Sequence, residues 1–283
     1  MPSEVRMLNL GCGGRFHPEW TNIDFYSSGG AVIAHDLNLG IPFPDSSFDV
    51  VYHSHVLEHF PKAKARRFIA ECVRVLKPGG ILRVVVPDLE QIVRLYVDAR
   101  ERARSGDPLW EQNYEWMMLE LFDQTVRETS GGEMGKYLGA ETIQNEAFVI
   151  ERLGHEARKS VLTHVRRMKN NPQRSSLITK IGRFASISEA FRALREFFIR
   201  LLLRSEYRML EVGRFRALGE VHQWMYDRYS LARLLEKAGF SEITQRAADE
   251  GYVANWRTFN LDTNADGSIY KADSLFIEAR KPV

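Results

Sequence analysis

Cysteine and long hydrophobic runs are both scarce in this chain. Only two cysteines, Cys12 and Cys72, occur among 283 residues, so there is neither a disulfide framework nor a cysteine-rich zinc site. No run of about 18 apolar residues could span a bilayer, and Met1-Pro2-Ser3 leads directly into charged residues. We therefore expect a cytoplasmic protein. Its 44% apolar content suffices for a packed core, in one large α/β domain or a domain with an insertion.

A strong net charge is also lacking, because the formal balance is only +2. The charges are nevertheless unevenly distributed: residues 151–216 hold 16 Lys and Arg but 6 Asp and Glu. Such a basic segment indicates a surface with an anionic neighbour. The alternative is a solvated helical face, which is the commoner outcome for a single charge run.

A glycine turn follows the first apolar run. Leu8-Asn9-Leu10 precede Gly11-Cys12-Gly13-Gly14, and a second short run, Thr21–Phe25, carries Asp24 near its end. Glycine lets the backbone turn sharply and lets a ligand approach the main chain. A carboxylate at the next strand end can accept hydrogen bonds from both hydroxyls of a ribose. The pattern therefore predicts a site for an adenosine-bearing cofactor at the edge of a parallel sheet.

The spacing of this motif argues against NAD. A dinucleotide fold expects G-x-G-x-x-G and an acidic residue about 20 residues further on. Here the third glycine is missing, Asp24 follows Gly11 by 13 residues, and Pro18 leaves room for little more than one helical turn. A cofactor with one nucleoside and no phosphates fits better.

Three motifs, in this order, carry a resemblance to a known family: Asn9–Gly13 with Asn22–Asp24, Phe48–His59, and Arg74–Leu82. They resemble class I S-adenosylmethionine-dependent methyltransferases. The resemblance implies an α/β, Rossmann-like sheet, parallel with an antiparallel last strand, and S-adenosyl-L-methionine as cofactor. The segment His222–Leu231, leading to Leu235–Phe240, is similar to a type-11-like subgroup of predicted bacterial methyltransferases often found in polysaccharide biosynthesis clusters.

The chain is expected to divide into three parts. Residues 1–88 form the first part of the cofactor-binding core, 89–218 a large helical insertion that the resemblance implies is a cap, and 219–283 the rest of the core. Breaks in the insertion are expected at residues 105–108, 130–132 and 170–172. Strands are predicted at Arg6–Leu10, Thr21–Phe25, Ala31–His35, Phe48–Tyr52, Ile81–Val86, Phe240–Thr244 and Ser274–Ala279, and helices at Lys62–Val75 and Leu231–Ala238.

Residues 187–204 read as a basic amphipathic helix. Apolar residues recur at helical spacing from Ile187 to Leu201, and four arginines fall on the other side. Packing within the protein or a homodimer contact is the first interpretation. Peripheral contact with an anionic membrane is the alternative.

The resemblance assigns cofactor contacts to particular residues. It implies main-chain contact of Gly11, Cys12 and Gly13 with the methionine part and ribose contact at Asp24. Leu10 and Phe25, which adjoin these residues, are also expected to bind the cofactor. Asp36 and Leu37 match the position at the edge of the adenine, although a turn-like Asp36-Leu37-Asn38 also suits a helix cap. His53, at the tip of its strand, is expected to face either the methionine end of the cofactor or a network of carbonyl groups.

Methyl transfer needs an acceptor held in line with the S–CH₃ bond and, for a hydroxyl acceptor, a group that takes its proton. His55 and His222 are the candidate bases. Each also has a structural interpretation, as a neighbour of a helix cap or as a tie between insertion and core. Asp88 is a candidate for binding an acceptor hydroxyl. The sequence shows no compact carboxylate cluster, so no metal is predicted.

The leading hypothesis is O-methylation of a sugar, nucleotide-sugar or glycan hydroxyl. The alternatives are a methyltransferase of a small aromatic or lipid-like metabolite and a catalytically silent S-adenosylmethionine-binding scaffold. A nucleic-acid substrate is not expected, because Tyr52-His53-Ser54-His55 stands where the Asn/Asp-Pro-Pro-aromatic motif of N-methylating relatives would be.

Overall fold

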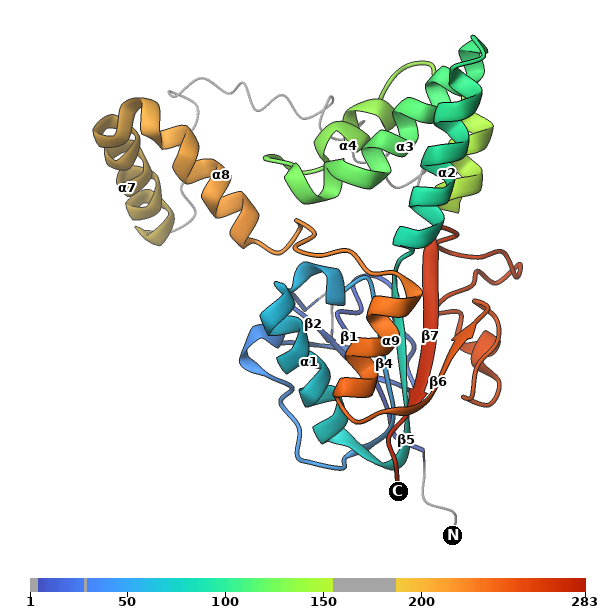
Figure 1. Cartoon of the computed structure of the whole chain (residues 1–283). Coiled ribbons are helices and arrows are strands. Elements are labelled where there is room, and N and C mark those ends of the chain that lie inside the picture. Colours follow the sequence, from blue (N-terminus) through green and yellow to red (C-terminus); the bar gives the residue numbers. More distant parts are fainter. Residues whose placement is uncertain (1–4, 28–29, 155–186) are drawn as a thin grey trace.

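The computed structural model describes residues 5–27, 30–154 and 187–283 (Figure 1). Seven strands form one mixed sheet in the order β3-β2-β1-β4-β5-β7-β6. The strands are β1 (Met7–Leu10), β2 (Thr21–Asp24), β3 (Val32–Ala34), β4 (Phe48–Ser54), β5 (Leu76–Pro87), β6 (Ser241–Arg246) and β7 (Ser274–Arg280). The first five strands are parallel, and β7 lies antiparallel between β5 and β6. The predicted Rossmann-like sheet is therefore confirmed.

Helices α1 (Lys62–Val75) and α9 (Arg228–Lys237) cover one face of the sheet (Figure 1). In α1, the buried residues Ala65, Phe68, Ile69 and Cys72 recur at intervals of three and four and form one apolar stripe. They pack on side chains such as Leu8 of the sheet in the largest core cluster. The predicted bounds of α1 are confirmed.

The other face of the sheet is covered mainly by the segment between β6 and β7. Trp256, in the short 3-10 helix η4 (Trp256–Phe259), and Leu261 pack on Tyr52 and Trp20 in a second core cluster. Arg83 of β5 is fully buried beneath this segment. Its guanidinium ties the segment to the sheet through ion pairs with Asp262 and with Glu278 of β7.

The part of the insertion that follows β5 forms a helical unit with its own core. It contains α2 (Leu89–Ala103), α3 (Pro108–Val126), α4 (Gly132–Leu138) and a further helical stretch over 146–154. Trp116 and Met117 are fully buried in a third cluster between these helices. The breaks predicted at 105–108 and 130–132 separate these helices as expected, and the one at 170–172 lies outside the described residues.

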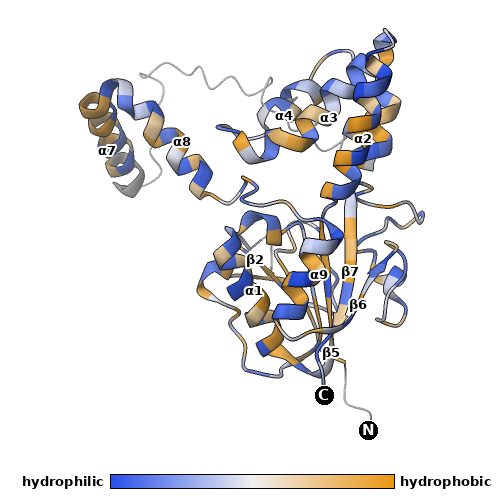
Figure 2. Ribbon diagram, in the orientation of Figure 1, coloured by the Kyte–Doolittle hydropathy of each residue, from blue (hydrophilic) through white to orange (hydrophobic). Residues whose placement is uncertain are grey.

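Helices α7 (Ile187–Leu203) and α8 (Tyr207–Ala217) extend away from the sheet (Figure 1). Figure 2 shows the concentration of apolar residues along α7. Phe191, Phe197 and Leu202 are among its exposed side chains. The expected burial of this stripe against the core is therefore not seen in the described part of the chain. None of the described helices is both long and apolar enough to cross a membrane.

Candidate active site

The glycine turn at the end of β1 needs glycine at its first position. Gly11 and Gly13 have φ angles of +64° and +54°, which lie in the left-handed region that side chains rarely adopt. A Cβ on Gly11 would lie 2.4 Å from Cγ2 of Val56. Next to it, the backbone N–H of Cys12 donates to the carbonyl of Ile23 at 3.0 Å. The turn is therefore held tightly between β2 and the segment after β4.

A cleft opens beside this turn, at the carboxyl ends of β1 and β4. Its lining joins residues from both ends of the chain: Asn9, Gly11–Arg15, Tyr52, Ser54, His55, Leu261, Tyr270 and Lys271. Cβ atoms on Gly13 or Gly14 would meet nothing within 4 Å, so open space lies over the turn. The open edge of a parallel sheet is where cofactors of this fold class bind.

Two cations line the cleft that the sequence alone did not point to. The guanidinium of Arg15 donates to the carbonyl of Thr263 at 2.6 Å and to Oδ1 of Asn264 at 2.8 Å, and it stacks over Tyr270. The ammonium of Lys271 makes no hydrogen bond with a described residue, and burial lowers its pKa. Lys271 reaches the cleft only through the long loop before β7, so no local pattern could have indicated it.

Asp24 lies beside the glycine turn at the end of β2. Its carboxylate accepts hydrogen bonds from the N–H of Gly13 at 2.7 Å and from the N–H of Tyr26 at 3.4 Å. The neighbouring Phe25 is exposed and packs edge-on against Tyr26. The structure therefore brings Asp24 to the turn, as the motif predicted, while Phe25 points to solvent.

Asp36 is the cap of a short 3-10 helix, η1 (Leu37–Leu39). Its carboxylate accepts from the backbone N–H and the side-chain amide of Asn38, both at 2.9 Å. These two bonds lower the pKa of Asp36. Leu37 packs against the core and lines a separate hollow with α1 residues. The cap interpretation of Asp36 thus accounts for its contacts, and neither residue lines the cleft.

His53 differs from its expected position. The ring of His53 is fully buried and packs edge-on against Phe68 of α1 at 5.1 Å, and the Leu10 side chain lies in the same core. Side chains alternate along a strand, so Tyr52 faces the cleft side and His53 faces α1. We therefore correct the expectation that His53 faces the cofactor. Leu10 can contribute only main-chain atoms.

His55 lines the cleft with a backbone in the left-handed region, at φ +54°. Its Nδ1 lies 3.3 Å from Oε1 of Glu58, and its Nε2 lies 2.9 Å from Oγ of Ser274. The imidazole is thus oriented by one partner on each side. Strained backbone of this kind often occurs at functional sites.

Glu58 is a fully buried carboxylate in the 3-10 helix η2 (Leu57–His59). Burial raises its pKa, but the contact with His55 and the nearby imidazoles of His222 and His59 outweigh burial and bring the pKa to about 2. Neither carboxylate oxygen has a hydrogen-bond partner among the described groups. Glu58 is therefore a buried anion surrounded by histidines.

His222 and Asp88 lie outside the cleft lining. His222 is buried with its ring 4.9 Å from that of His59, and burial lowers its pKa to about 3. Asp88 caps α2, because its Oδ1 accepts from the N–H of Gln91 at 3.2 Å, and burial raises its pKa. The candidate acceptor-binding role of Asp88 thus competes with a cap role that its contacts already explain.

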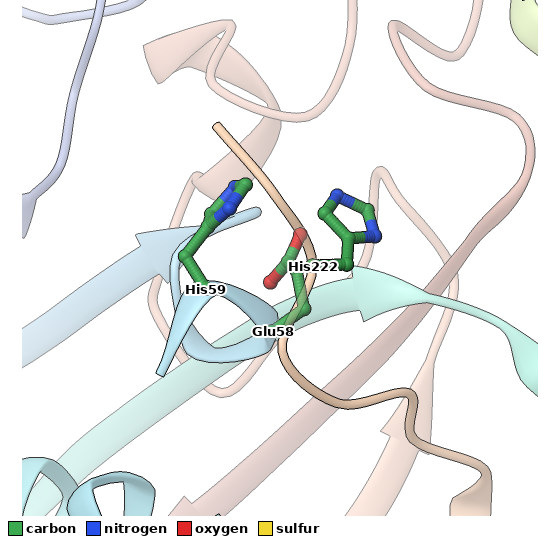
Figure 3. A group of neighbouring side chains, drawn as sticks. All are labelled: Glu58, His59 and His222. Atoms are coloured by element: carbon green, nitrogen blue, oxygen red, sulfur yellow. The ribbon is translucent and has the colours of Figure 1, made fainter. Parts of the chain in front are cut away.

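Figure 3 shows Glu58, His59 and His222 turned toward one another. One ligand-type atom from each lies within 4.8 Å of the other two. The sequence showed the adjacent Glu58 and His59 but gave no sign that His222 joins them. Only the return of the chain from α8 to α9 brings this histidine to η2.

Comparisons with known proteins find similarity to methyltransferases over parts of the chain. Residues 8–84 match a family model described as a methyltransferase domain. A protein named "Probable methyltransferase ltbC" from Aspergillus luteorubrus is 32% identical over 116 residues, or 37% of this chain and 41% of that protein. A phthiotriol/phenolphthiotriol dimycocerosates methyltransferase from Mycobacterium leprae is 37% identical over 87 residues, or 30% of this chain and 25% of that protein.

Among solved structures, a SAM-dependent methyltransferase from Archaeoglobus fulgidus aligns over 99% of this chain and 87% of its own, with a TM-score of 0.38 and 12% identity. The chain spans less than half the length of the two curated relatives above. The glycine turn and β4 both lie within the segment that matches the methyltransferase domain.

Proposed function

We propose that this chain is an S-adenosylmethionine-dependent methyltransferase. The observation that carries the proposal is the bare glycine turn beside Asp24, within a segment that matches a methyltransferase domain. Open space over Gly13 and Gly14 suits a ligand that approaches the main chain. Asp24 is the acceptor for the ribose hydroxyls, and the cations Arg15 and Lys271 suit the carboxylate of the methionine part.

The cofactor supplies an activated methyl group on a positively charged sulfur. The protein then has to hold an acceptor in line, exclude water and take a proton from a hydroxyl. We assign the proton to Nε2 of His55, the one histidine among the described residues that line the cleft, with Glu58 3.3 Å from the other ring nitrogen. The bond from Nε2 to Ser274 is exchanged for one to the acceptor.

For the acceptor we propose a sugar, nucleotide-sugar or glycan hydroxyl. The resemblance of His222–Leu231 to the polysaccharide-cluster subgroup supports this class. A lipid-like acceptor is the second candidate, because the exposed apolar side chains of α7 suit a lipid surface and the Mycobacterium leprae relative is named for a phthiotriol substrate. Residues 89–218 would cap the acceptor in either case.

Two measurements test the proposal. Isothermal titration with S-adenosylmethionine is expected to give saturable binding, and no binding at millimolar cofactor would reject the enzyme. Transfer of a labelled methyl group to a panel of nucleotide sugars, extracted glycans and hydroxylated lipids, followed by mass spectrometry, then identifies the acceptor class. Binding without transfer to any acceptor supports the silent scaffold instead.

His55→Ala tests the base. We expect turnover to fall by about 10²- to 10⁴-fold while cofactor affinity stays within a factor of about two. His17→Asn is the matched control, since His17 lies outside the cleft lining. Full turnover in His55→Ala would show that the proton leaves by another route.

A further inference from the structure

We propose that Glu58, His59 and His222 bind a divalent first-row metal ion of the zinc type. This site lies next to the cleft and does not depend on the proposed methyl transfer. Its three side chains come from η2 and from the segment that returns from α8 to α9 (Figure 3). The ion would therefore link the end of β4 to the returning chain.

The donor set indicates the kind of ion. One carboxylate oxygen and two imidazole nitrogens suit zinc and its first-row neighbours, whereas magnesium and calcium prefer oxygen ligands alone. The three ligand atoms lie within 4.8 Å of one another. Around an ion with bonds of about 2.1 Å, such atoms stand roughly 3.4 Å apart, so the side chains have to close by about an ångström. Three protein ligands leave a coordination position for water.

Several buried polar atoms at the site have no hydrogen-bond partner among the described groups. Both oxygens of Glu58 and Nδ1 of His222 are buried without a hydrogen-bond partner among the described groups. A buried carboxylate without hydrogen bonds is expensive. Nδ1 of His55 lies 3.3 Å from one oxygen of Glu58, on one side only. A bound cation would satisfy these atoms together.

The protein scaffold already holds the ligands in place. Nδ1 of His59 lies 3.4 Å from the carbonyl of Val221; because a carbonyl only accepts, Nδ1 carries the proton and Nε2 is left with its lone pair. This arrangement is common for metal-binding histidines. The N–H groups of Gln223 and Trp224 both donate to the carbonyl of Glu58, at 2.7 and 3.2 Å. Backbone bonds thus dock the segment that carries His222 directly on Glu58.

The proposal departs from the sequence-based expectation of no metal, which considered carboxylate clusters and cysteines. His59 is partly exposed, while Glu58 is fully buried and His222 is 5% exposed. An ion would enter from the His59 side.

Metal binding to the purified full chain tests the site. After chelator treatment, we expect Co²⁺ to bind one ion per chain with the visible absorption of a nitrogen- and oxygen-ligated ion, and Zn²⁺ to displace it. Mg²⁺ should not compete. Zn²⁺ should also raise the unfolding temperature, because it binds only the folded state. These readouts require no methyl-transfer activity, so their failure is distinguishable from failure of the proposed function.

Three variants locate the ion. Glu58→Gln keeps the shape of the side chain, His222→Ala removes a buried ring, and His59→Ala removes a partly exposed one that is least needed for folding. Each is expected to weaken Co²⁺ binding by about 100-fold or more, with circular dichroism unchanged. His35→Asn, outside the cluster, should bind as the parent does. No Co²⁺ absorption in the parent, or unchanged binding in the three variants, would overturn the proposal.

Discussion

The carboxylate of Asp24 accepts a hydrogen bond from the backbone N–H of Gly13 at 2.7 Å. The side chain assigned to the ribose thus also fixes the glycine turn that would face the cofactor. A carboxylate has enough lone pairs for both tasks. Cofactor affinity is therefore expected to be sensitive to this single side chain.

Asp24→Ala is expected to weaken S-adenosylmethionine binding by about 10- to 100-fold, the usual range for hydrogen bonds to a charged group. Asp24→Asn should give a smaller loss, because an amide keeps one acceptor oxygen. Titration calorimetry measures both. Asp45→Ala, an exposed carboxylate paired with Arg74, is the control and should bind normally. Equal affinity in Asp24→Ala and the parent would contradict the ribose assignment.

Gly11→Ala is expected to destabilise the fold by about 2–4 kcal/mol, through a left-handed alanine and a collision with Val56. Cofactor binding should be lost with it. Gly14→Ala is the matched control three residues further along the same turn, where a Cβ meets nothing within 4 Å, and should stay within about 0.5 kcal/mol of the parent. Urea unfolding measures the difference.

A Val56→Ala background separates the two causes of this destabilisation, which are the collision with Val56 and the left-handed backbone at position 11. In Val56→Ala chains the collision disappears and only the left-handed backbone remains. Gly11→Ala should therefore be less destabilising there than in the parent. An identical effect in both backgrounds would show that the close approach to Val56 is relieved in another way.

Local patterns predicted much of the sheet and of the glycine turn. The apolar runs and the spacing of Ala65, Phe68 and Ile69 are local properties, so the strands and α1 could be inferred, whereas the antiparallel last strand was implied by the family resemblance. The direction of His53 could not: β4 is buried on both faces, so its sequence gives no sign of which side chains face α1. The proximity of Glu58 and His222 could not be predicted from the sequence either, because it depends on how the insertion returns to the core.

The buried ion network of Arg83 is expected to be a major stabilising feature. Nε of Arg83 lies 2.8 Å from Oδ2 of Asp262 and one terminal nitrogen lies 3.1 Å from Oε1 of Glu278, with all three side chains buried. Removing one partner leaves uncompensated buried charge. Arg83→Met should therefore lower the free energy of unfolding by about 3–5 kcal/mol in urea. A loss below about 1 kcal/mol would mean that the two carboxylates are protonated or hydrated in the variant.

The exposed pair of Arg94 with Glu90 on α2 provides the control. Arg94→Ala should change stability by less than about 0.5 kcal/mol. The Arg83 network also reaches the cleft, because the hydroxyl of Tyr52 donates to Asp262 at 2.6 Å. Cofactor affinity is thus expected to fall in Arg83→Met and to be unchanged in Arg94→Ala.

His53 is expected to make the fold sensitive to acid. Burial lowers its pKa to about 4, although the negative Glu58 acts the other way, whereas an unfolded histidine titrates near 6.5. Above pH 6.5 the ring is neutral in both states and the stability is complete. Between pH 6.5 and 4 only the unfolded chain binds the proton. The free energy of unfolding therefore decreases as the pH is lowered, by up to about 3 kcal/mol.

His53→Phe replaces the imidazole by another ring that can pack against Phe68. This variant should flatten the dependence of the unfolding free energy on pH between pH 6.5 and 4. His35→Asn is the control and should retain the parent profile. Urea titrations at a series of pH values, on chelator-treated protein, give both curves. Parallel curves for parent and His53→Phe would assign the acid sensitivity to another group.

Helix α7 provides the last prediction, because its apolar residues are exposed beside arginines. The exposed apolar side chains are Phe191, Leu194, Phe197, Phe198, Leu201 and Leu202. Arg192 and Arg195 are exposed on the same helix. We propose that α7 binds an anionic lipid surface, to which each arginine contributes about 1 kcal/mol. Flotation with phosphatidylcholine vesicles containing phosphatidylglycerol is expected to carry the protein upward, less so as salt increases.

Arg192→Glu with Arg195→Glu should reduce vesicle binding by about tenfold or more, and Phe197→Ser with Phe198→Ser should reduce it at all salt concentrations because apolar burial is lost. Arg94→Glu with Arg102→Glu on α2 reverses as much charge on another exposed helix and should leave flotation unchanged. Sedimentation measures the oligomeric state and so tests the alternative that the apolar face of α7 is a homodimer contact. A dimer that the two phenylalanine substitutions dissociate, without any flotation of the parent, would assign the apolar face of α7 to a second copy of the chain.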